Sequence, residues 1–364
     1  MSKGKIICTV TNDITHDRRM QRICSSLAEY GFDVLLVGRE KSTSVSLGTY
    51  AFKTYRLKLK NGSGPLFYYE YNRKLAKYLK SQTADIIYAV DTDTLMAAAK
   101  SAKTNKVKLV YDAHEYFSEV PELEHKPVKK WIWKYLEKKY IKQTDARITV
   151  GEKLAEIFEQ LYNLPFAVVR NVPMLESKND QSTKEKIILY QGVLNKGRGL
   201  ETMIDAMADV KDQSITFHLA GGGDIEQELK ERAVAKSYAH RIMFHGWQSG
   251  DQLVEHTKKA WLGINLLNAT SLNYKYSLAN KFFDYMHQGV PSLNMDLPEY
   301  RAIIDKHEVG FLLSKLDASE VANCINAITT QSYTAMSQAT RAAAEEYNWQ
   351  KDSQVLLATV DQLI

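Results

Sequence analysis

The chain has 364 residues, of which 45% are hydrophobic and 25% are charged. This length exceeds one ordinary hydrophobic core, so we expect two domains of a soluble globular protein. The three cysteines are an odd number without CxxC spacing, which disfavours a disulfide framework or a zinc site and favours a reducing, cytoplasmic compartment. No apolar run approaches the ~18 residues of a membrane-spanning helix, and a first strand from residue 5 predicts that there is no signal peptide.

The formal net charge of +5 is unevenly distributed. Residues 1–170 contain 29 Lys and Arg against 19 Asp and Glu, whereas residues 171–364 contain 19 against 24. The asymmetry suggests that the first half meets an anionic surface.

The first half alternates short apolar runs with amphipathic segments. An amphipathic helix is predicted over 18–30, closed by Gly31, and strands are predicted over 5–10, 33–38, 85–90, 108–112 and 146–150. Short strands that alternate with helices predict a parallel sheet with helices on both faces.

The second half repeats this pattern after a polar stretch, 176–186, which we interpret as the linker. Its predicted strands cover 187–191, 216–220, 242–244, 262–267 and 292–294. We therefore predict an α/β protein with two doubly wound parallel-sheet domains, over 1–175 and 184–347. A C-terminal helix over 348–364 is expected to cross back to the first domain. In such folds ligands bind at the carboxyl ends of strands, here in a central cleft between the domains.

Segment 278–291, LANKFFDYMHQGVP, carries the clearest ligand signal. Asn280 and Lys281 stand at the predicted start of a helix, whose free N–H groups and partial positive charge favour phosphate. Asp284, one turn later, suits a ligand that also presents hydroxyls, as a ribose does. The pairing points to a nucleotide with a sugar attached.

Two further loops follow predicted strands of the second half. GVLNKGRGL, over 192–200, supplies Lys196 and Arg198 beside glycines that let the backbone approach a ligand. GGGD, over 221–224, opens a helix, although a tight strand–helix turn needs glycine for structural reasons as well. Arg198 and Lys281 could together hold a diphosphate without metal and stabilise its charge as it leaves.

These residues resemble a known family. GVLNKGRGLETMIDA, HLAGGGD, FHGW and LANKFFDYMHQGVPSLNMDLPEYRAII are similar, in this order, to the C-terminal half of the group 1 (family four) glycosyltransferases with the GT-B fold. TNDITHDRRMQRICSSLAEYGFDVLLVGR and KLVYDAHEYF resemble the first half of the bacterial polysaccharide-assembly branch. The resemblance implies retaining transfer of a sugar from a UDP- or GDP-sugar to a glycan or lipid-linked acceptor in cell-surface polysaccharide synthesis. It implies no cofactor and no metal.

The resemblance assigns roles to matching positions. Arg198 matches a basic residue on the diphosphate, and Val193 stands where the family has another arginine, which Lys196 or Lys281 could replace. Asp284 matches a glutamate on the ribose. Tyr276 stands where a second glutamate contacts the donor sugar, so the resemblance leaves the transferred sugar open. The implied donor-binding set is Gly192, Arg198, Gly222, Asn280, Lys281 and Asp284.

In the first half, His114 matches a family histidine near the donor sugar and the reaction centre. With Arg198 and Lys281 it completes the predicted catalytic set, while Asp17 and Arg18 follow the first strand on the acceptor side. Structural alternatives remain open. His114 could cap the next helix, Asp284 could pair with Lys281 on a helix surface, and Asp17 could belong to a solvated turn.

Two acidic residues, Asp91 and Asp93, form a DxD sequence, which in another glycosyltransferase fold holds a divalent ion. Here we expect Asp93 instead to cap a helix over 94–103. No metal site is predicted.

Segment 126–142 contains seven lysines and one glutamate among two tryptophans and two tyrosines. As a helix it would have one apolar face flanked by lysines, formed by Val128, Trp131, Ile132, Tyr135 and Leu136. This composition is typical of a helix on anionic lipid, and would make the protein peripheral on the inner face of the membrane. Alternatively, the apolar face packs on its own domain.

Two other functions compete with glycosyl transfer: a GT-B-fold nucleotide-sugar epimerase and a non-catalytic glycan-binding protein. Nucleic acid is disfavoured as a partner, because the lysines concentrate in one helix and do not line a groove with stacking aromatics.

Overall fold

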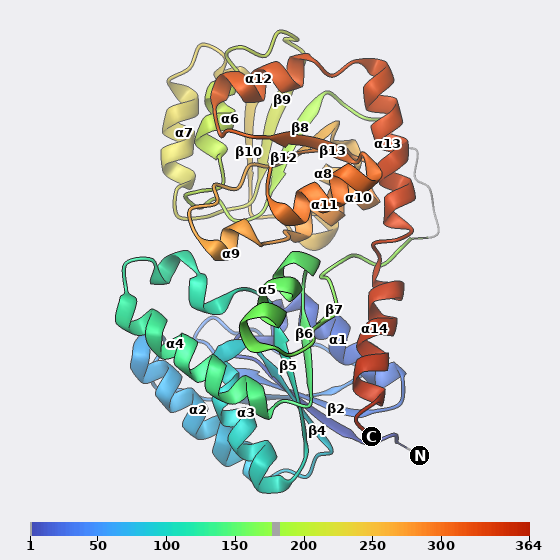
Figure 1. Ribbon diagram of the computed structural model, residues 1–364. Coiled ribbons are helices and arrows are strands. Elements are labelled where there is room, and N and C mark those ends of the chain that lie inside the picture. Colours follow the sequence, from blue (N-terminus) through green and yellow to red (C-terminus); the bar gives the residue numbers. More distant parts are fainter. Residues whose placement is uncertain (1, 177–182) are drawn as a thin grey trace. The chain divides into compact units, whose positions relative to one another are not determined.

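The computed structural model describes residues 2–176 and 183–364 (Figure 1). Most of the predicted linker, 177–182, lies outside the described residues. The chain divides into two compact units, which are Met1–Asn171 together with Lys351–Ile364, and Val172–Gln350. Each unit is built on a parallel sheet, as the alternation of strands and helices predicts.

Unit 1 contains a parallel sheet with the strand order β3-β2-β1-β4-β5-β6-β7. Its strands are β1 Lys5–Thr9, β2 Asp33–Arg39, β3 Lys53–Leu57, β4 Ile86–Val90, β5 Lys108–Ala113, β6 Ala146–Thr149 and β7 Ala167–Val168. Its helices are α1 Arg18–Glu29, α2 Gly64–Lys80, α3 Asp91–Asn105, α4 Pro127–Tyr140, α5 Glu152–Tyr162 and most of α14 Trp349–Asp361. Helices α2, α3 and α4 pack side by side (Figure 1). The strand order reverses between β1 and β4, so right-handed crossovers place α1 on the opposite face of the sheet from α3.

Unit 2 contains a second parallel sheet with the strand order β10-β9-β8-β11-β12-β13. Its strands are β8 Ile187–Gln191, β9 Thr216–Ala220, β10 Ile242–Gly246, β11 Leu262–Asn265, β12 Ser292–Met295 and β13 Gly310–Leu313. Its helices are α6 Leu200–Ala206, α7 Glu226–Val234, α8 Gly250–Lys259, α9 Leu272–Lys275, α10 Asn280–His287, α11 Pro298–His307, α12 Ala318–Asn326 and α13 Thr330–Ala344.

The central strands of both sheets read as continuous apolar runs because helices cover both faces of a parallel sheet. All five residues of β4 are buried, and so are all five of β8. The predicted strands are confirmed with small shifts at their ends, whereas β3, β7 and β13 were not predicted. These three lie toward the edges of the two sheets.

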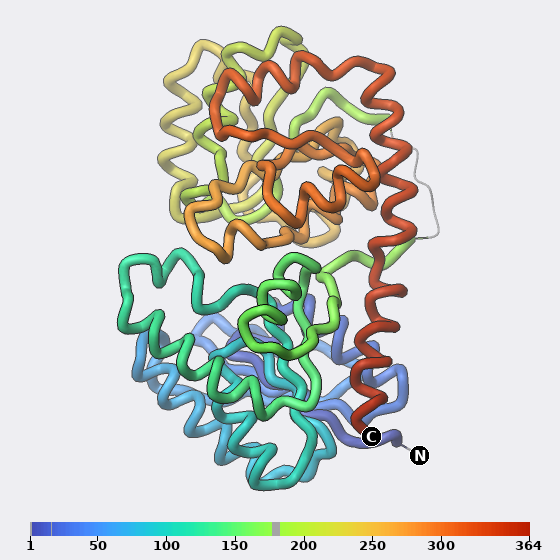
Figure 2. Tube along the Cα trace, viewed as in Figure 1, coloured from blue at the N-terminus to red at the C-terminus, as the bar shows by residue number. Residues whose placement is uncertain are grey.

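The C-terminal helix α14 ends within unit 1, where Ile364 lies beside Gly4, just before β1 (Figure 2). The Asp352 carboxylate accepts hydrogen bonds from the backbone N–H of Arg170 (2.6 Å) and from Arg170 Nη1 (3.3 Å). Farther along the helix, Lys3 Nζ lies 2.9 Å from Asp361 Oδ1. In the part of the chain that is described, no helix combines the length and the apolar character needed to span a bilayer.

Candidate active site

The candidate donor site lies in unit 2, where the strand order reverses between β8 and β11. The loops after β8 and β9 contact each other through their backbones. Leu194 N–H donates to the Gly222 carbonyl (3.0 Å), and Gly192 N–H donates to the Ala220 carbonyl (3.0 Å). A Cβ atom on Gly221 would lie 1.8 Å from the Gly192 carbonyl oxygen. The glycine cluster therefore has a structural role, which is to let these two loops pack closely.

Lys281 lies in the first turn of α10, which begins at Asn280 as predicted. Its Nζ is 3.7 Å from the centroid of the Tyr190 ring, and a Cβ on Gly192 would lie 3.4 Å from the same atom. Burial lowers the pKa of the Lys281 ammonium well below its ordinary value; Arg198 lowers it further, and Asp284 opposes the shift. Among the described residues Lys281 forms no ion pair, so an anionic ligand would relieve an unfavourable charge.

Arg198 lies close enough to Lys281 for the two charges to repel each other. Its guanidinium carbon is 5.2 Å from the centroid of the Tyr274 ring. Arg198 Nε is shielded from solvent and has no hydrogen-bond partner in the described part of the chain. Two cations flanked by tyrosine rings therefore stand beside the N-terminus of α10, which is an arrangement suited to a diphosphate.

Asp284 follows one turn after Lys281 and is half-buried. Its Oδ2 accepts a hydrogen bond from Gln191 Nε2 (2.8 Å), and Gln191 Oε1 accepts one from Thr257 Oγ1 (2.7 Å). This chain of hydrogen bonds fixes the carboxylate beside the carboxyl end of β8. A carboxylate held in this way can accept hydrogen bonds from a diol.

The remaining predicted donor-side residues are placed differently. Asn280 and Lys196 are exposed. Tyr276 caps the end of α9, and Lys275 Nζ lies 5.6 Å from the centroid of its ring. In unit 2 the structure thus brings together Gly192, Arg198, Lys281 and Asp284, while Lys196 and Tyr276 take no described part in this cluster.

In unit 1, His114 follows β5 and is anchored to Asp112 of that strand. Its Nε2 lies 2.9 Å from Asp112 Oδ2. The buried Asp112 carboxylate also accepts hydrogen bonds from Arg19 Nη2 (3.0 Å) and Tyr88 Oη (2.7 Å). Burial alone would raise the pKa of Asp112, but Arg19 and then His114 hold it well below its ordinary value.

The other side of His114 faces Asp91. The backbone N–H of His114 donates to Asp91 Oδ1 (2.8 Å), and His114 Nδ1 is 3.9 Å from Asp91 Oδ2. Burial alone would lower the pKa of His114, but the nearby carboxylates, Asp112 foremost, raise it above its ordinary value. His114 does not cap the next helical turn, which begins after Tyr116.

The expectation that Asp93 caps a helix is wrong. Helix α3 already begins at Asp91, after Val90, so Asp93 lies inside the first turn. Asp93 is buried, and its Oδ2 accepts a hydrogen bond from Thr11 Oγ1 (2.6 Å). Burial raises the pKa of Asp93 to about 7. Across the described ranges, no group of three or more His, Cys, Asp or Glu side chains is arranged to hold a metal ion.

Asp17 and Arg18 have simpler environments. Asp17 caps α1 by accepting a hydrogen bond from the Met20 N–H (3.0 Å), which makes it a helix cap and not part of a solvated ion pair. Arg18 is exposed. Sequence reasoning grouped Arg19 with Asp17 and Arg18 after the first strand but did not predict its buried partner. Arg19 stands four residues before Ile23 on the buried face of α1, where an arginine is rarely found unless it is paired.

Two Rossmann-like parallel-sheet units, one with a cationic site at a helix N-terminus, define a GT-B-fold protein. Family comparison agrees with this class. The sequence model described as "Glycosyl transferases group 1" matches residues 185–331, and the one described as "Glycosyltransferase Family 4" matches residues 17–173. Between them the two matches cover most of the chain, which belongs to the group 1 glycosyltransferases.

The individual proteins that match this chain share little sequence identity with it. An uncharacterized glycosyltransferase of Methanocaldococcus jannaschii is 27% identical over 127 residues, which are 35% of this chain and only 31% of that relative. Anabaena HepE, solved with UDP, matches over 100% of both chains with a TM-score of 0.76 and 15% identity. Sucrose-phosphate synthase of Thermosynechococcus elongatus matches over 99% of each chain with a TM-score of 0.79 and 15% identity. At these identities the two structures show a shared fold.

Proposed function

We propose that this glycosyltransferase moves a sugar, with retention of its anomeric configuration, from a UDP- or GDP-sugar to a glycan or lipid-linked acceptor. The product would be a cell-surface polysaccharide. The observation that carries the proposal is the pair of cations Arg198 and Lys281. Lys281 lies in the first turn of α10 with its Nζ 3.7 Å from the centroid of the Tyr190 ring. The Arg198 guanidinium carbon lies 5.2 Å from the centroid of the Tyr274 ring. A similar fold that was solved with UDP supports a uridine donor as the first to test.

In the proposed reaction, Arg198 and Lys281 bind the diphosphate and stabilise the charge that it gains as the sugar leaves. Two positioned cations can supply this stabilisation, so no metal is invoked. Asp284 would bind the ribose hydroxyls. His114 would bind sugar hydroxyls through Nδ1, because Asp112 occupies Nε2. With no covalent nucleophile assigned, we propose that the acceptor attacks from the face that the diphosphate leaves.

The test compares Arg198→Ala and Lys281→Ala with Lys196→Ala. Lys196 belongs to the same loop as Arg198 but is exposed, so its loss controls for net charge. Each lost charge-assisted hydrogen bond is worth about 1.5–3 kcal/mol. We therefore expect UDP or GDP affinity, measured by calorimetry, to fall about tenfold or more in the first two variants. Turnover should fall roughly 10²-fold or more.

Near-normal nucleotide binding in both site variants would refute the diphosphate assignment. Incubating the donor alone separates transfer from epimerisation, since an epimerase would isomerise the sugar without an acceptor. A protein that binds neither UDP, GDP, ADP nor their sugars would instead favour the non-catalytic alternative.

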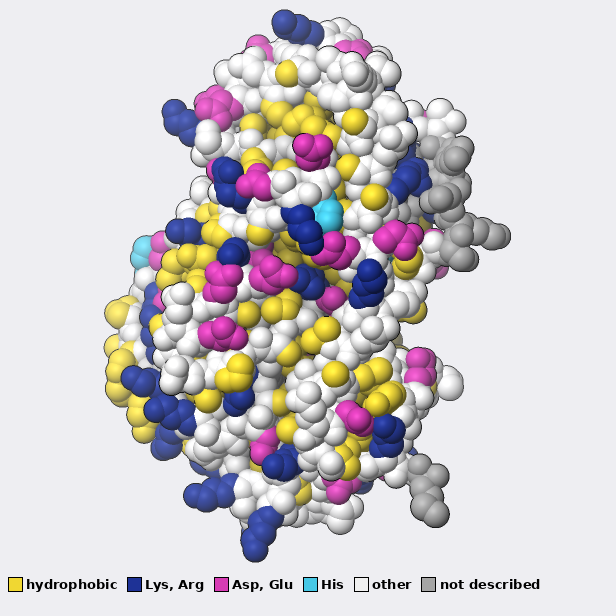
Figure 3. All heavy atoms as spheres, turned by 45° about the vertical axis from the view of Figure 1, so that its right-hand side comes forward, with side chains coloured by type: hydrophobic (Ala, Val, Ile, Leu, Met, Phe, Trp, Pro, Cys, Tyr) yellow, Lys and Arg dark blue, Asp and Glu magenta, His cyan; other side chains and the backbone are white. Residues whose placement is uncertain are grey.

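We also propose that α4 holds the enzyme on an anionic membrane surface. Val128 is 69% exposed, Trp131 65% and Tyr135 50%, so these residues do not pack on their own domain. The Trp131 and Tyr135 rings stack at 5.8 Å. Hydrophobic side chains adjoin Lys and Arg at the left edge of the molecule in Figure 3. Exposed aromatics flanked by lysines fit the interface of an anionic bilayer.

Vesicle sedimentation tests this proposal. Vesicles that contain phosphatidylglycerol should bind the protein, and neutral phosphatidylcholine vesicles should bind it much less. Trp131→Ser should weaken binding, whereas Trp247→Ser, which removes a 76% exposed tryptophan of unit 2, should not. Trp133 is a poor probe because its ring packs against Tyr68 and Phe117. Equal binding to both kinds of vesicle would contradict the electrostatic part.

A further inference from the structure

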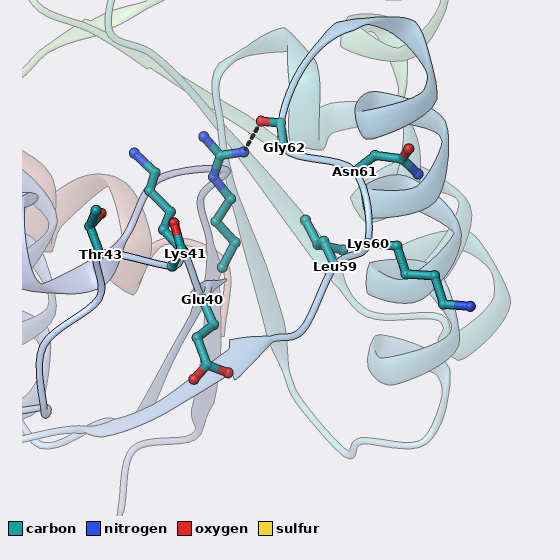
Figure 4. A pocket seen from close by; sticks show the side chains of 9 residues that line it. Glu40, Lys41, Thr43, Leu59, Lys60, Asn61 and Gly62 are labelled. Carbon is teal, nitrogen blue, oxygen red and sulfur yellow. Dashed lines mark hydrogen bonds between the residues drawn. The ribbon is translucent and has the colours of Figure 1, made fainter.

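Unit 1 contains a cavity of about 450 Å³ at the carboxyl ends of β2 and β3 (Figure 4). Residues 39–43 and 59–62 line it. Its volume lies within the range of small-molecule sites, and the carboxyl ends of parallel strands are where this class of sheet binds ligands. None of the donor-side residues belongs to this cavity.

The cavity carries an excess of positive charge. Arg39, Lys41 and Lys60 line it, against the single carboxylate of Glu40. That carboxylate lies 3.8 Å from Lys58 Nζ, and in Figure 4 it points in the opposite direction from the Lys41 side chain. Within the described ranges neither Arg39 nor Lys41 forms an ion pair. Their charges are therefore available to an anionic ligand.

Arg39 is held in place for such a ligand. Its Nη1 donates a hydrogen bond to the Gly62 carbonyl (3.0 Å), and its guanidinium carbon lies 4.3 Å from the centroid of the Phe67 ring. Its Nε is shielded from solvent and has no hydrogen-bond partner among the described residues. Its charge acts on the buried Asp93 carboxylate, whose pKa it lowers against the effect of burial. The two form no ion pair within the described ranges, and Asp93 Oδ2 already accepts a hydrogen bond from Thr11 Oγ1 (2.6 Å). A guanidinium fixed in this way is preorganised for the planar recognition of phosphate.

The N-terminus of α2 adds a second favourable feature. This helix of 17 residues begins at Gly64, two residues after Gly62 of the cavity wall. Ser63 makes no side-chain cap, and the first turn contains no acidic residue. The N–H groups and the dipole of α2 present positive charge at this end of the helix. The one carboxylate of α2 on this side, Glu70, is already engaged, because it accepts hydrogen bonds from the backbone N–H groups of Lys60 and Asn61 (3.0 Å each).

We propose that this cavity binds a phosphoryl group carried by the acceptor. The inference rests on the proposed transferase function for its biological meaning, but phosphate binding can be measured without it. Two sources share this chemistry, a phosphorylated sugar of a growing glycan and the diphosphate of a lipid-linked acceptor. Either would be held by Arg39 and Lys41, whereas the Lys60 side chain points away from Lys41 in Figure 4.

The test titrates the full-length protein by calorimetry with inorganic phosphate, a hexose 6-phosphate and a short-chain isoprenyl diphosphate, with the unphosphorylated hexose as a blank. Lys41→Met and Arg39→Met are compared with Lys53→Met. Lys53 is a 71% exposed lysine outside the cavity, so Lys53→Met removes the same positive charge without changing the cavity. Arg39 packs against Phe67, and its variant could unfold; Lys41 serves as the second probe because its loss leaves no cavity in the core.

We expect Lys41→Met and Arg39→Met to weaken binding of a phosphorylated probe about tenfold, and Lys53→Met to leave it unchanged. Preference for the hexose phosphate identifies a glycan source, and preference for the isoprenyl diphosphate identifies a lipid source. Equal affinities of Lys41→Met and Lys53→Met, or no binding of any phosphorylated probe, would overturn the inference. UDP and GDP titrations of the same variants test the donor site separately, so a failed donor site and a failed cavity give different results.

Discussion

At the residue scale, Asp112 connects the strand interior of unit 1 to its candidate catalytic histidine. The carboxylate is completely buried and receives hydrogen bonds from Arg19, Tyr88 and His114. A buried charge is tolerated only when it is paired and hydrogen-bonded in this way. Arg19 is fixed in turn, since its Nη1 donates to the Val169 carbonyl (2.8 Å). The arrangement determines which ring nitrogen of His114 can reach a ligand.

Replacing Asp112 by Asn should lower the pKa of His114. Asp112 is the strongest influence raising that pKa, whereas burial and Arg19 lower it. A neutral amide at position 112 leaves only the more distant Asp91 carboxylate to oppose them. The His114 ring of the variant should therefore lose its proton at a lower pH than the ring of the wild-type protein. NMR titration of the His114 ring measures the change. Tyr88→Phe, which removes a donor but no charge, should shift it less, and an unchanged titration in Asp112→Asn would disprove the coupling.

At the element scale, the two loops that carry the donor site depend on backbone contact. Gly221 has φ of +156°, and a Cβ there would collide with the Gly192 carbonyl oxygen at 1.8 Å. Neither atom is the end of a flexible side chain, so relief requires the loops to separate. The loop after β8 also carries Arg198, which links this packing to ligand binding.

Gly221→Ala should therefore destabilise unit 2 strongly, on the order of 4 kcal/mol, and weaken nucleotide binding. Gly246→Ala is the matched control. Gly246 also has positive φ, +67°, but has no atom within 4 Å of its ideal Cβ, so it should cost only the backbone strain, about 1 kcal/mol. Thermal melting with and without UDP compares the two variants. Similar melting temperatures would show that the loops can rearrange at little cost.

The sequence predicted the central strands of both sheets because burial on both faces requires continuous apolar runs such as IIYAV in β4. It did not predict β3, KTYRL, whose first four residues alternate between exposed and half-buried and in which only Leu57 is buried. An edge strand pairs on one side only, so fewer of its residues need to be apolar. Strand β7 has two residues, too few for any periodicity to indicate.

The residues of the candidate site likewise include some that local sequence predicts and others that only the fold brings together. Lys281 was predicted because local sequence reveals a helix start, and α10 begins at Asn280. The partnership of Arg19 with Asp112 joins residues 93 positions apart, and no local pattern specifies such a pair. Arg39 escaped notice for a related reason, since its cavity forms only when the segments after β2 and β3 fold side by side.

At the scale of the whole molecule, the chain passes between the two units twice, after Asn171 and again after Gln350. The second passage returns α14 to unit 1, where Asp352 pairs with Arg170 and Asp361 with Lys3. Leu356 and Val360 of this helix are completely buried. Unit 1 is therefore completed by the last segment of the sequence.

Truncation after Gln350 should destabilise unit 1 while leaving unit 2 able to bind nucleotide. Complete burial of a Leu or Val side chain contributes about 1.5–3 kcal/mol, so losing Leu356 and Val360 removes several kcal/mol from a unit whose total stability is of order 5–15 kcal/mol. Hydrogen–deuterium exchange should accelerate in β1 and β2, and UDP should still protect β8 and α10. Lys3→Ala removes only surface contacts, the partly exposed pair with Asp361 and the contact of Lys3 Nζ with the Tyr30 ring (3.7 Å to its centroid), so it should change exchange little. If β1 and β2 stay as protected in the truncated chain as in the full one, α14 is a peripheral attachment and does not complete the unit.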